Sequence, residues 1–159
     1  MEKQYLNDIW VLFFHDNSDN WDNSSFKLIT TVSTVEDFCK IYKTLTSDNY
    51  WLKGMFFIFR EDIMPRWEDE NNIEGGCFSY KIATQDADDK WFDLCSKVLS
   101  ETLSQKECYN QNINGISITP KKNANILRIW LKDNDLVNPE FYNISTTKFS
   151  TLLYKKHQN

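Results

Sequence analysis

The amino-acid sequence predicts an α+β domain in which an antiparallel β-sheet carries three helices on one face. Several short stretches are continuously apolar or alternate between apolar and polar residues, and polar turns separate them, which is typical of strands. Three longer stretches repeat apolar residues at helical spacing after a capping residue. The chain of 159 residues is 41% hydrophobic and 26% charged, and no linker or repeat interrupts it, so we expect one domain over residues 1–159.

The first two predicted strands border a loop that contains a tryptophan. Residues 1–8 are mostly polar, and we expect a flexible arm there. Residues 9–15 form an apolar run that predicts a buried strand, and residues 26–32 alternate well enough for a second strand. The loop between them, residues 16–25, is rich in Asp, Asn and Ser and holds Trp21 in its middle.

The first helix is expected to begin after Ser33 or Thr34. Either residue is a good N-cap, because an acidic residue follows three positions later in both cases. The next apolar positions recur at helical spacing, which most simply indicates core packing with only one edge available to a partner. These positions are Val35, Phe38, Cys39, Tyr42 and Leu45.

The middle of the chain predicts two more strands and a long helix. Residues 54–60 are expected to form a central strand and residues 77–82 a fourth one, with Gly75-Gly76 giving the backbone freedom to turn between them. The segment Asp86–Asp89, which contains three aspartates, supplies a cap and a favourable charge for the long helix. Its apolar side consists of Trp91, Phe92, Leu94, Cys95, Val98, Leu99 and Leu103.

The last third of the chain predicts a hairpin and a final helix. Residues 113–119 and 126–132 alternate around the turn 120–125 and predict two paired strands. Ser145 is a candidate cap for a last helix over residues 146–156. Its apolar positions are Phe149, Leu152 and Leu153.

Trp67 stands on the loop between the third and fourth strands, and a carboxylate, Glu68, follows it directly. An aromatic face beside an anion fits a flat, cationic ligand that donates hydrogen bonds, and a methylated guanine is such a ligand. The alternative is that Trp67 packs into a small satellite cluster while the acids form a solvated turn. Trp21 is a second tryptophan on a polar loop, and its alternative role is a lid over the sheet edge.

Charge and cysteine usage narrow the class of protein. The net charge of -5 indicates that any contact with nucleic acid is local and ligand-sized. The four cysteines include no Cys-x-x-Cys pair, and only two histidines are present, so we expect no metal or other cofactor. Without a leader or an apolar run long enough for a membrane span, and with disulfides unexpected, the chain is predicted to be a soluble cytoplasmic protein.

Two other classes of function fit the residues less well. A cysteine nucleophile needs a neighbouring base, and only His15 and His157 are available, one at a strand end and one in the tail. We therefore expect no enzyme. An interaction domain whose slot has decayed is disfavoured because Trp21, Trp67 and Glu68 are all present.

The motifs, in their order and spacing, resemble the translation initiation factor 4E family of messenger-RNA cap-binding proteins. The resemblance runs from about Leu6 to Trp130, with a looser continuation into the predicted last helix. The matching motifs are Trp10-Val-Leu-Phe-Phe, Trp21, Thr34-Val-Glu-Asp-Phe, Pro65-Arg-Trp-Glu-Asp-Glu-Asn, Gly75-Gly76, Trp91 and Arg128-Ile-Trp130. Any one of them is weak, whereas the set is specific.

The resemblance implies a curved antiparallel β-sheet with three helices on the convex face. It implies that Trp21 and Trp67 stack on both sides of the 7-methylguanosine cap while Glu68 accepts its two edge N–H groups. The backbone N–H of Trp67 would reach the guanine oxygen, and Trp130 would contact the methyl group. The implied function is recruitment of capped mRNA for translation initiation.

The phosphate site implied by the resemblance has fewer basic residues than is usual in the family. Lys121 aligns with a basic phosphate ligand and Lys122 is a possible second one, but Asn123 and Ile126 occupy the other basic positions. Where the family commonly has a basic residue and a Trp after Gly75-Gly76, this chain has Cys77 and Phe78. The chain also stops soon after its predicted last helix, whereas the family usually continues into a further strand and a loop.

The resemblance also implies a partner surface on the convex face, formed by Leu6, Val35, Glu36, Cys39 and Phe92. Because Cys39 replaces the Trp that the family presents on its first helix, we expect weak binding of a scaffold factor 4G-like protein, or a specialised partner. The alternative function is a divergent cap binder that sequesters mRNA and represses translation.

Overall fold

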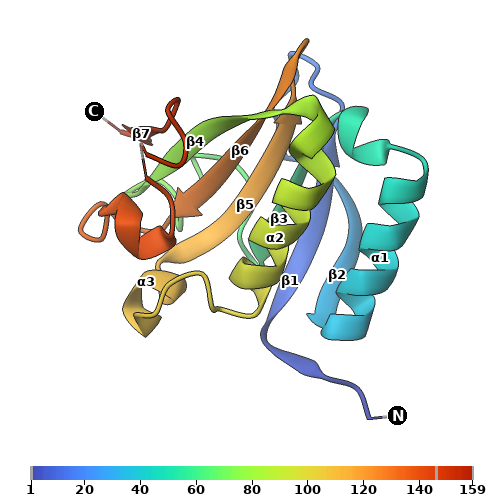
Figure 1. The fold of residues 1–159 in the computed structure, drawn as a ribbon, viewed down its shortest axis with the longest axis horizontal. Coiled ribbons are helices and arrows are strands. Elements are labelled where there is room, and N and C mark those ends of the chain that lie inside the picture. The colour runs from blue at the N-terminus through green and yellow to red at the C-terminus, as the bar shows by residue number, and fades with distance from the viewer. Residues whose placement is uncertain (1, 146, 159) are drawn as a thin grey trace.

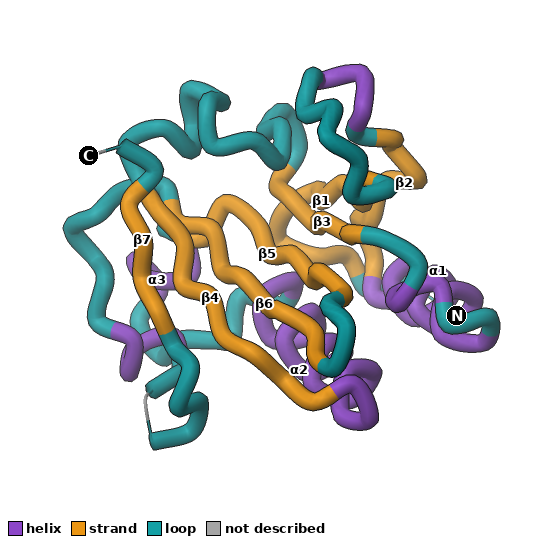
Figure 2. Tube along the Cα trace, turned by 90° about the horizontal axis from the view of Figure 1, so that it is seen from above, coloured by secondary structure: helices purple, strands orange, loops and turns teal. Residues whose placement is uncertain are grey.

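The computed structural model describes residues 2–145 and 147–158, and its strands form one antiparallel sheet in the order β2-β1-β3-β5-β6-β4-β7 (Figure 1). The strands are β1 (Tyr5–His15), β2 (Lys27–Thr34), β3 (Met55–Arg60), β4 (Gly76–Ala83), β5 (Ile113–Pro120), β6 (Ala124–Leu131) and β7 (Leu153–Lys156). The helices are α1 (Val35–Ser47), α2 (Ala87–Leu99) and α3 (Glu107–Gln111). The helices lie on the convex side of the curved sheet, and long loops lie on the other side (Figure 2). The predicted fold class is confirmed.

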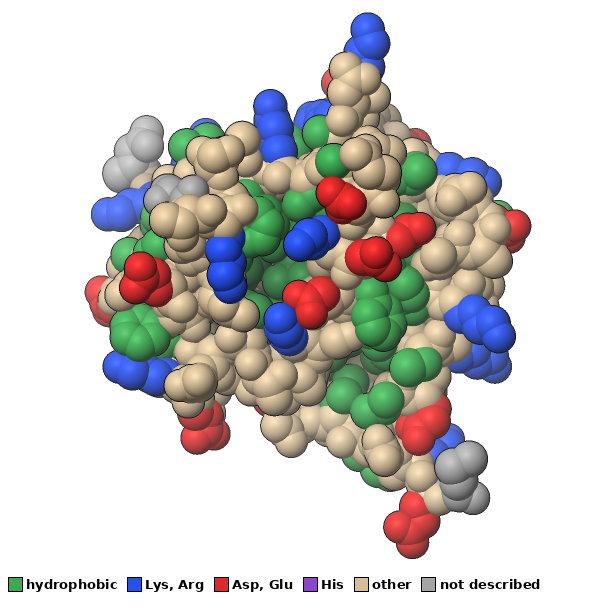
Figure 3. All heavy atoms as spheres, viewed as in Figure 1, with side chains coloured by type: hydrophobic (Ala, Val, Ile, Leu, Met, Phe, Trp, Pro, Cys, Tyr) green, Lys and Arg blue, Asp and Glu red, His purple; other side chains and the backbone are tan. Residues whose placement is uncertain are grey.

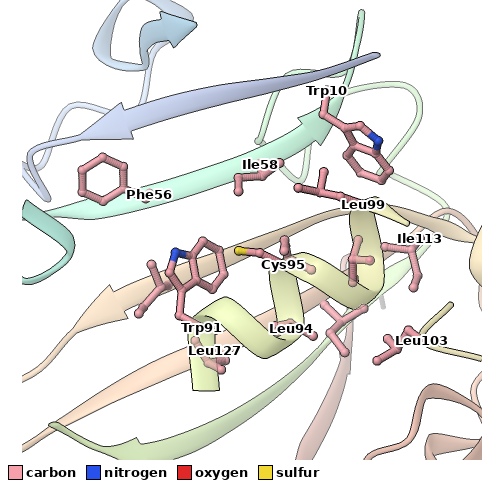
Figure 4. Packing of buried hydrophobic residues seen from close by; sticks show 14 of the residues in the cluster. Trp10, Phe56, Ile58, Trp91, Leu94, Cys95, Leu99, Leu103, Ile113 and Leu127 are labelled. Carbon is pink, nitrogen blue, oxygen red and sulfur yellow. The ribbon is translucent and has the colours of Figure 1, made fainter. Parts of the chain in front are cut away.

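The two faces of the sheet carry different side chains, as alternation along a strand requires. On the convex side, one face of α2 packs onto the central strands through Trp91, Cys95 and Leu99, all buried (Figure 4). The concave side carries a smaller, mostly aromatic cluster: Val11, Phe13, Phe26, Met55, Phe57 and Phe59. This second cluster forms the floor below the tryptophan loops.

Helix α1 begins where the sequence predicts. The Thr34 hydroxyl accepts a hydrogen bond from the backbone N–H of Asp37 at 3.0 Å, and the Asp37 carboxylate accepts the backbone N–H of Thr34 at 3.1 Å. This reciprocal capping box selects Thr34 over Ser33 as the cap. Phe38 and Tyr42 are buried against the core, whereas Cys39 is exposed.

The flexible arm predicted for residues 1–8 is wrong for its second half. Strand β1 begins at Tyr5, which is paired with Thr34 of β2, and the backbone N–H of Val35 donates to the Gln4 carbonyl at 2.9 Å. The side chains at this end of β1 are mostly polar because they are exposed, so the sequence shows no strand pattern there. The backbone N–H and C=O groups nevertheless need hydrogen-bond partners, which β2 and the start of α1 provide. Residue 1 lies outside the described residues.

Gly75 and Gly76 serve a different purpose from the one predicted. Neither glycine has a positive φ, so conformational freedom is not what the site needs. A Cβ at Gly75 would lie 1.8 Å from the Leu131 carbonyl oxygen, and one at Gly76 would lie 2.5 Å from the Lys155 carbonyl oxygen. Glycine is required here because neighbouring backbones approach closely.

The helix predicted over residues 146–156 is wrong, and Thr146 lies outside the described residues. The segment instead makes turns and then strand β7, which pairs with the free edge of β4. Phe149 stacks on Tyr80 and Tyr154 packs on Phe78, so tertiary packing overrides the helical spacing of a short segment. The third helix is α3, a short helix that was not expected from the sequence.

Candidate functional site

A cavity of about 380 Å³ opens on the concave side between two loops. Trp21 from the loop after β1 and Trp67 from the loop after β3 line it, and they are 44% and 48% exposed. Glu68 and Trp130 line the same cavity, so the structure brings together all the residues predicted for the base-binding part of the site. Its floor is formed by Phe26, Met55 and Phe57 of the concave cluster.

The Trp67 loop is held by side chains that the sequence analysis did not single out. The Asp69 carboxylate accepts the backbone N–H groups of Met64 at 2.9 Å and Asn71 at 2.8 Å. The buried Asn72 amide donates to the carbonyl oxygens of Met64 and Arg66 at 2.9 and 2.8 Å. These bonds close the loop on itself, and they place Trp67 and Glu68 at its rim.

Further support for this loop comes from the sheet below it. The side-chain amide of Asn114, buried on β5, donates to the Asn71 carbonyl at 2.7 Å and to the Asn72 side-chain oxygen at 3.0 Å. Asn114 is the one amide side chain within the predicted strand 113–119. Because a buried amide needs hydrogen-bond partners, its presence could have indicated a contact with a loop. The loop is therefore anchored to β5.

Trp21 rests on His15, the last residue of β1. The two rings are stacked, with centroids 4.0 Å apart and planes 4° from parallel. His15 is fully buried, its Nε2 lies 2.7 Å from the Asn20 carbonyl oxygen, and its Nδ1 accepts the Asn17 backbone N–H at 2.8 Å. A carbonyl can only accept, so the proton is on Nε2 and the imidazole is neutral. His15 thus holds the loop and supports the indole.

Glu68 has a position suited to ligand contact. Its carboxylate is 41% exposed and forms an ion pair of 3.4 Å with the guanidinium of Arg66. Trp130 is half-buried, donates its indole N–H to the Ser117 hydroxyl at 3.2 Å and packs edge-on against Phe59. The site therefore combines two exposed indoles, one accessible carboxylate and an apolar floor.

A second cavity, of about 520 Å³, lies beside the first and shares Trp67, Arg128 and Trp130 with it. Its other walls come from β4 and from the chain end, namely Cys77, Ser79, Lys155, Lys156 and His157. Of these residues, only Cys77 and His157 drew attention in the sequence, Cys77 for its position after Gly75-Gly76 and His157 as a histidine in the tail, and neither was predicted as a site residue. Arg128 stood in a matching motif, but no role was assigned to it.

The second cavity contains a contact between a cysteine and a histidine, which the sequence did not predict. Cys77 Sγ lies 3.2 Å from His157 Nε2, so one cysteine does have a neighbouring base. His157 Nδ1 lies 2.7 Å from the Asn72 carbonyl oxygen, which places the proton on Nδ1. Burial raises the pKa of the Cys77 thiol, and burial also lowers the pKa of His157 from its ordinary value of 6.5. The pair is therefore neutral, which is unlike an activated thiolate.

The remaining predicted site residues are spread more widely. Lys121 and Lys122 are exposed at the tip of the β5–β6 hairpin and do not line either cavity. On the convex side, Val35, Cys39 and Phe92 are exposed, and Phe92 packs on Phe38 of α1. Figure 3 shows hydrophobic side chains gathered between α1 and α2 beside acidic ones.

Two predicted partner residues are engaged within the chain. Glu36 accepts the Gln4 backbone N–H, at 3.3 and 3.2 Å to its two carboxylate oxygens. Leu6 is partly buried and packs against the convex core.

The curved sheet and its rim define an α+β protein with an aromatic slot on its concave face. The family model for eukaryotic initiation factor 4E matches residues 5–159, and the chain belongs to that family. Initiation factor 4E of Saccharomyces cerevisiae is 30% identical over 140 residues, which cover 84% of this chain and 64% of the yeast protein. The human factor is 27% identical over 135 residues, which cover 80% of this chain and 60% of the human protein.

A solved structure extends the likeness to three dimensions. Caenorhabditis elegans eIF4E-3, in complex with the 4E-binding protein Mextli and a cap analog, has a TM-score of 0.79 and 25% identity. The match covers 98% of this chain and 94% of that chain. The chain thus spans nearly all of the nematode structure but less than two thirds of the yeast and human proteins. Within residues 2–145 and 147–158, the structure has no helix with the length and apolar character that a membrane crossing needs.

Proposed function

We propose that this protein binds the 7-methylguanosine cap of messenger RNA and recruits capped mRNA for translation initiation. The observation that carries the proposal is the convergence of Trp21, Trp67 and Glu68 on one slot from loops that are distant in the sequence. Family membership and the nematode relative seen with a cap analog support it.

The chemistry of the slot matches a methylated guanine. Stacking of a base on an aromatic side chain contributes about 1–3 kcal/mol, and cation–π attraction adds up to about 2 kcal/mol when the ring is desolvated. Glu68 would accept the two N–H groups of the guanine edge, and a charged acceptor favours bases that present both donors. Trp130, which lines the same cavity, would contact the methyl group.

The partner surface is proposed on the convex face, at Leu6, Val35, Glu36, Cys39 and Phe92. Its exposed apolar groups on α1 and α2 support a helical segment of a scaffold factor 4G-like protein or of a specialised partner as the ligand. The nematode relative, seen with a 4E-binding protein, supports such an interaction.

The relatives are named as translation initiation factors, so a sequestering repressor is not favoured. We expect the protein to be no enzyme, because the neutral Cys77–His157 pair lacks a thiolate. We expect it to act in the cytoplasm, where translation takes place.

The test is retention on immobilised 7-methylguanosine triphosphate, with free methylated and unmethylated guanine nucleotides as competitors. We expect release by the methylated nucleotide and little release by the unmethylated one. The double variant Trp21→Ala/Trp67→Ala is the control and should not be retained. Equal competition by the two nucleotides would overturn the proposed function.

A further inference from the structure

We propose that the second cavity is an anion-binding extension of the slot, where Arg128 and Lys155 hold the phosphate chain of the methylguanosine nucleotide. The proposal rests on the proposed function, because the slot is what would place the nucleotide beside this cavity. Strand β7, whose residues the sequence predicted to be helical, would then contribute a phosphate ligand.

The strand register places both cations next to the slot. Trp130 of β6 is opposite Cys77 of β4, and Cys77 is opposite Lys155 of β7, so these residues form a row across the concave face. Adjacent strands are about 4.8 Å apart, which puts the Lys155 backbone about 10 Å from that of Trp130. Arg128 lies two residues from Trp130 on the same face of β6 and lines both cavities.

The charges of the second cavity favour a polyanion. Among the described residues, neither Arg128 nor Lys155 forms an ion pair with a carboxylate, whereas Glu68 at the slot is paired with Arg66. Arg128 donates one hydrogen bond, to the Thr119 hydroxyl at 3.2 Å, and a guanidinium has further N–H groups for phosphate oxygens. The carboxylate faces the guanine edge and the cations face the phosphates, which matches the charge distribution of a capped nucleotide.

The hairpin lysines are less well placed for the same task. Ala124, at the start of β6, is six residues from Trp130, which corresponds to about 20 Å at the rise of a strand. Lys121 and Lys122 lie beyond Ala124, at the hairpin tip, and are exposed there. Arg128 and Lys155 are therefore the nearer cations and line a cavity that adjoins the slot.

The end of β7 is held in place by contacts that do not use its cations. His157 bridges the Cys77 thiol and the Asn72 carbonyl, and its backbone N–H donates to the Gly75 carbonyl at 2.9 Å. The Tyr154 hydroxyl donates to the Asn134 side chain. Tyr154 precedes Lys155 in the strand, so its side chain is on the opposite face from that of Lys155. Lys155 is thus carried by an anchored strand while its ammonium group remains exposed.

The experiment compares 7-methylguanosine, its monophosphate and its triphosphate, with affinities measured by quenching of tryptophan fluorescence at several salt concentrations. In the wild type, the triphosphate should bind more tightly than the nucleoside. Arg128→Met and Lys155→Met should each reduce this gain in affinity by about tenfold. They should also flatten the salt dependence of triphosphate binding, because fewer cations meet the phosphates. Nucleoside affinity should change much less than triphosphate affinity.

Lys43→Met is the matched control, because Lys43 is exposed on α1 on the opposite side of the sheet. It should leave the gain and the salt dependence as in the wild type. Lys121→Met/Lys122→Met tests the hairpin. If this variant loses the triphosphate gain while Lys155→Met keeps it, the phosphate site is on the hairpin and the inference is wrong. Failure of the wild type to bind even the nucleoside would instead refute the proposed function.

Discussion

Neighbouring acidic residues of the Trp67 loop make different contacts: Asp69 accepts hydrogen bonds that shape the loop, and Glu68 lines the slot. Asp69 accepts backbone N–H groups of its own loop, whereas the Glu68 carboxylate lines the slot and forms an ion pair with the partly buried Arg66 side chain. Glu70 is exposed and lies next to them in the sequence. The three neighbouring acids therefore differ in their surroundings: the sequence singled out Glu68 beside Trp67, whereas the loop-forming bonds of Asp69 are visible only in the structure.

Glu68→Gln should weaken binding of 7-methylguanosine triphosphate by about 1.5–3 kcal/mol, the range for hydrogen bonds to a charged group. The amide presents one acceptor and an NH2 group that opposes a guanine donor. Isothermal titration calorimetry measures the change, and Glu70→Gln is the matched control that should bind as the wild type does. Asp69→Ala is a poor control, because it removes bonds that shape the loop. Equal affinities for Glu68→Gln and wild type would exclude Glu68 as the acceptor.

Trp21 stacks on the buried His15 with one face of its indole, and it also lines the slot. One face stacks on His15, and the indole as a whole is 44% exposed. Trp21→Ala should lower the affinity for methylated cap analogue by about 1–3 kcal/mol. Circular dichroism should show an intact fold, since Trp21 lies outside the buried core. An unchanged affinity in fluorescence titration would mean that Trp67 alone stacks on the base.

At the scale of the elements, the sequence predicts those whose signals are local. The start of α1 follows from a capping box that four consecutive residues define, and β5 and β6 follow from alternation around a polar turn. Strand β7 is a different case, because its pairing with β4 depends on an edge that only the folded sheet provides. The same applies to the second cavity, whose cations are 27 positions apart in sequence at Arg128 and Lys155 (155 − 128).

Thr34→Ala should lower the free energy of unfolding by about 1 kcal/mol, because it removes the side-chain acceptor of the capping box. Urea denaturation measures the change. Thr44→Ala, on the same helix, is the control: its hydroxyl donates only to the Lys40 carbonyl, and alanine has the higher helix propensity. The control should therefore be as stable as the wild type or slightly more stable. Equal stabilities of the two variants would mean that the cap contributes nothing measurable.

At the scale of the whole molecule, the proposed binding surface is assembled from widely separated segments on one side of a curved sheet. Trp21 lines the first cavity and His157 lines the second, and Trp67 and Trp130 line both, so the two adjoining cavities connect segments from different parts of the sheet. The net charge of -5 is compatible with a local cationic cavity, because that cavity gathers its cations at one edge. Residue types could predict the slot, but only the folded sheet shows which cations lie next to it.

His157 connects the chain end to Cys77 and Asn72. We expect its titration to make the free energy of unfolding of the protein depend on pH. Burial lowers the pKa of His157 below its ordinary value of 6.5, although the Asn72 carbonyl and the Glu68 charge oppose the shift. The unfolded chain therefore takes up a proton near pH 6.5 while the folded chain does not. The stabilising contribution of His157 is fully present above pH 6.5 and is lost as the pH falls below that value.

The prediction is that the stability difference between wild type and His157→Gln shrinks as the pH is lowered from about 8 to about 5. Urea denaturation at each pH measures it, and taking the difference cancels the other titrating groups, which both proteins share. The protonated imidazole would place a second proton against the Cys77 thiol, whose pKa is raised by burial and which therefore stays uncharged. It would gain only partial compensation from the Glu68 carboxylate. Parallel pH curves for the two proteins would show that His157 has the same pKa in the folded and unfolded chains, and that its bridge between Cys77 and Asn72 does not depend on the neutral ring.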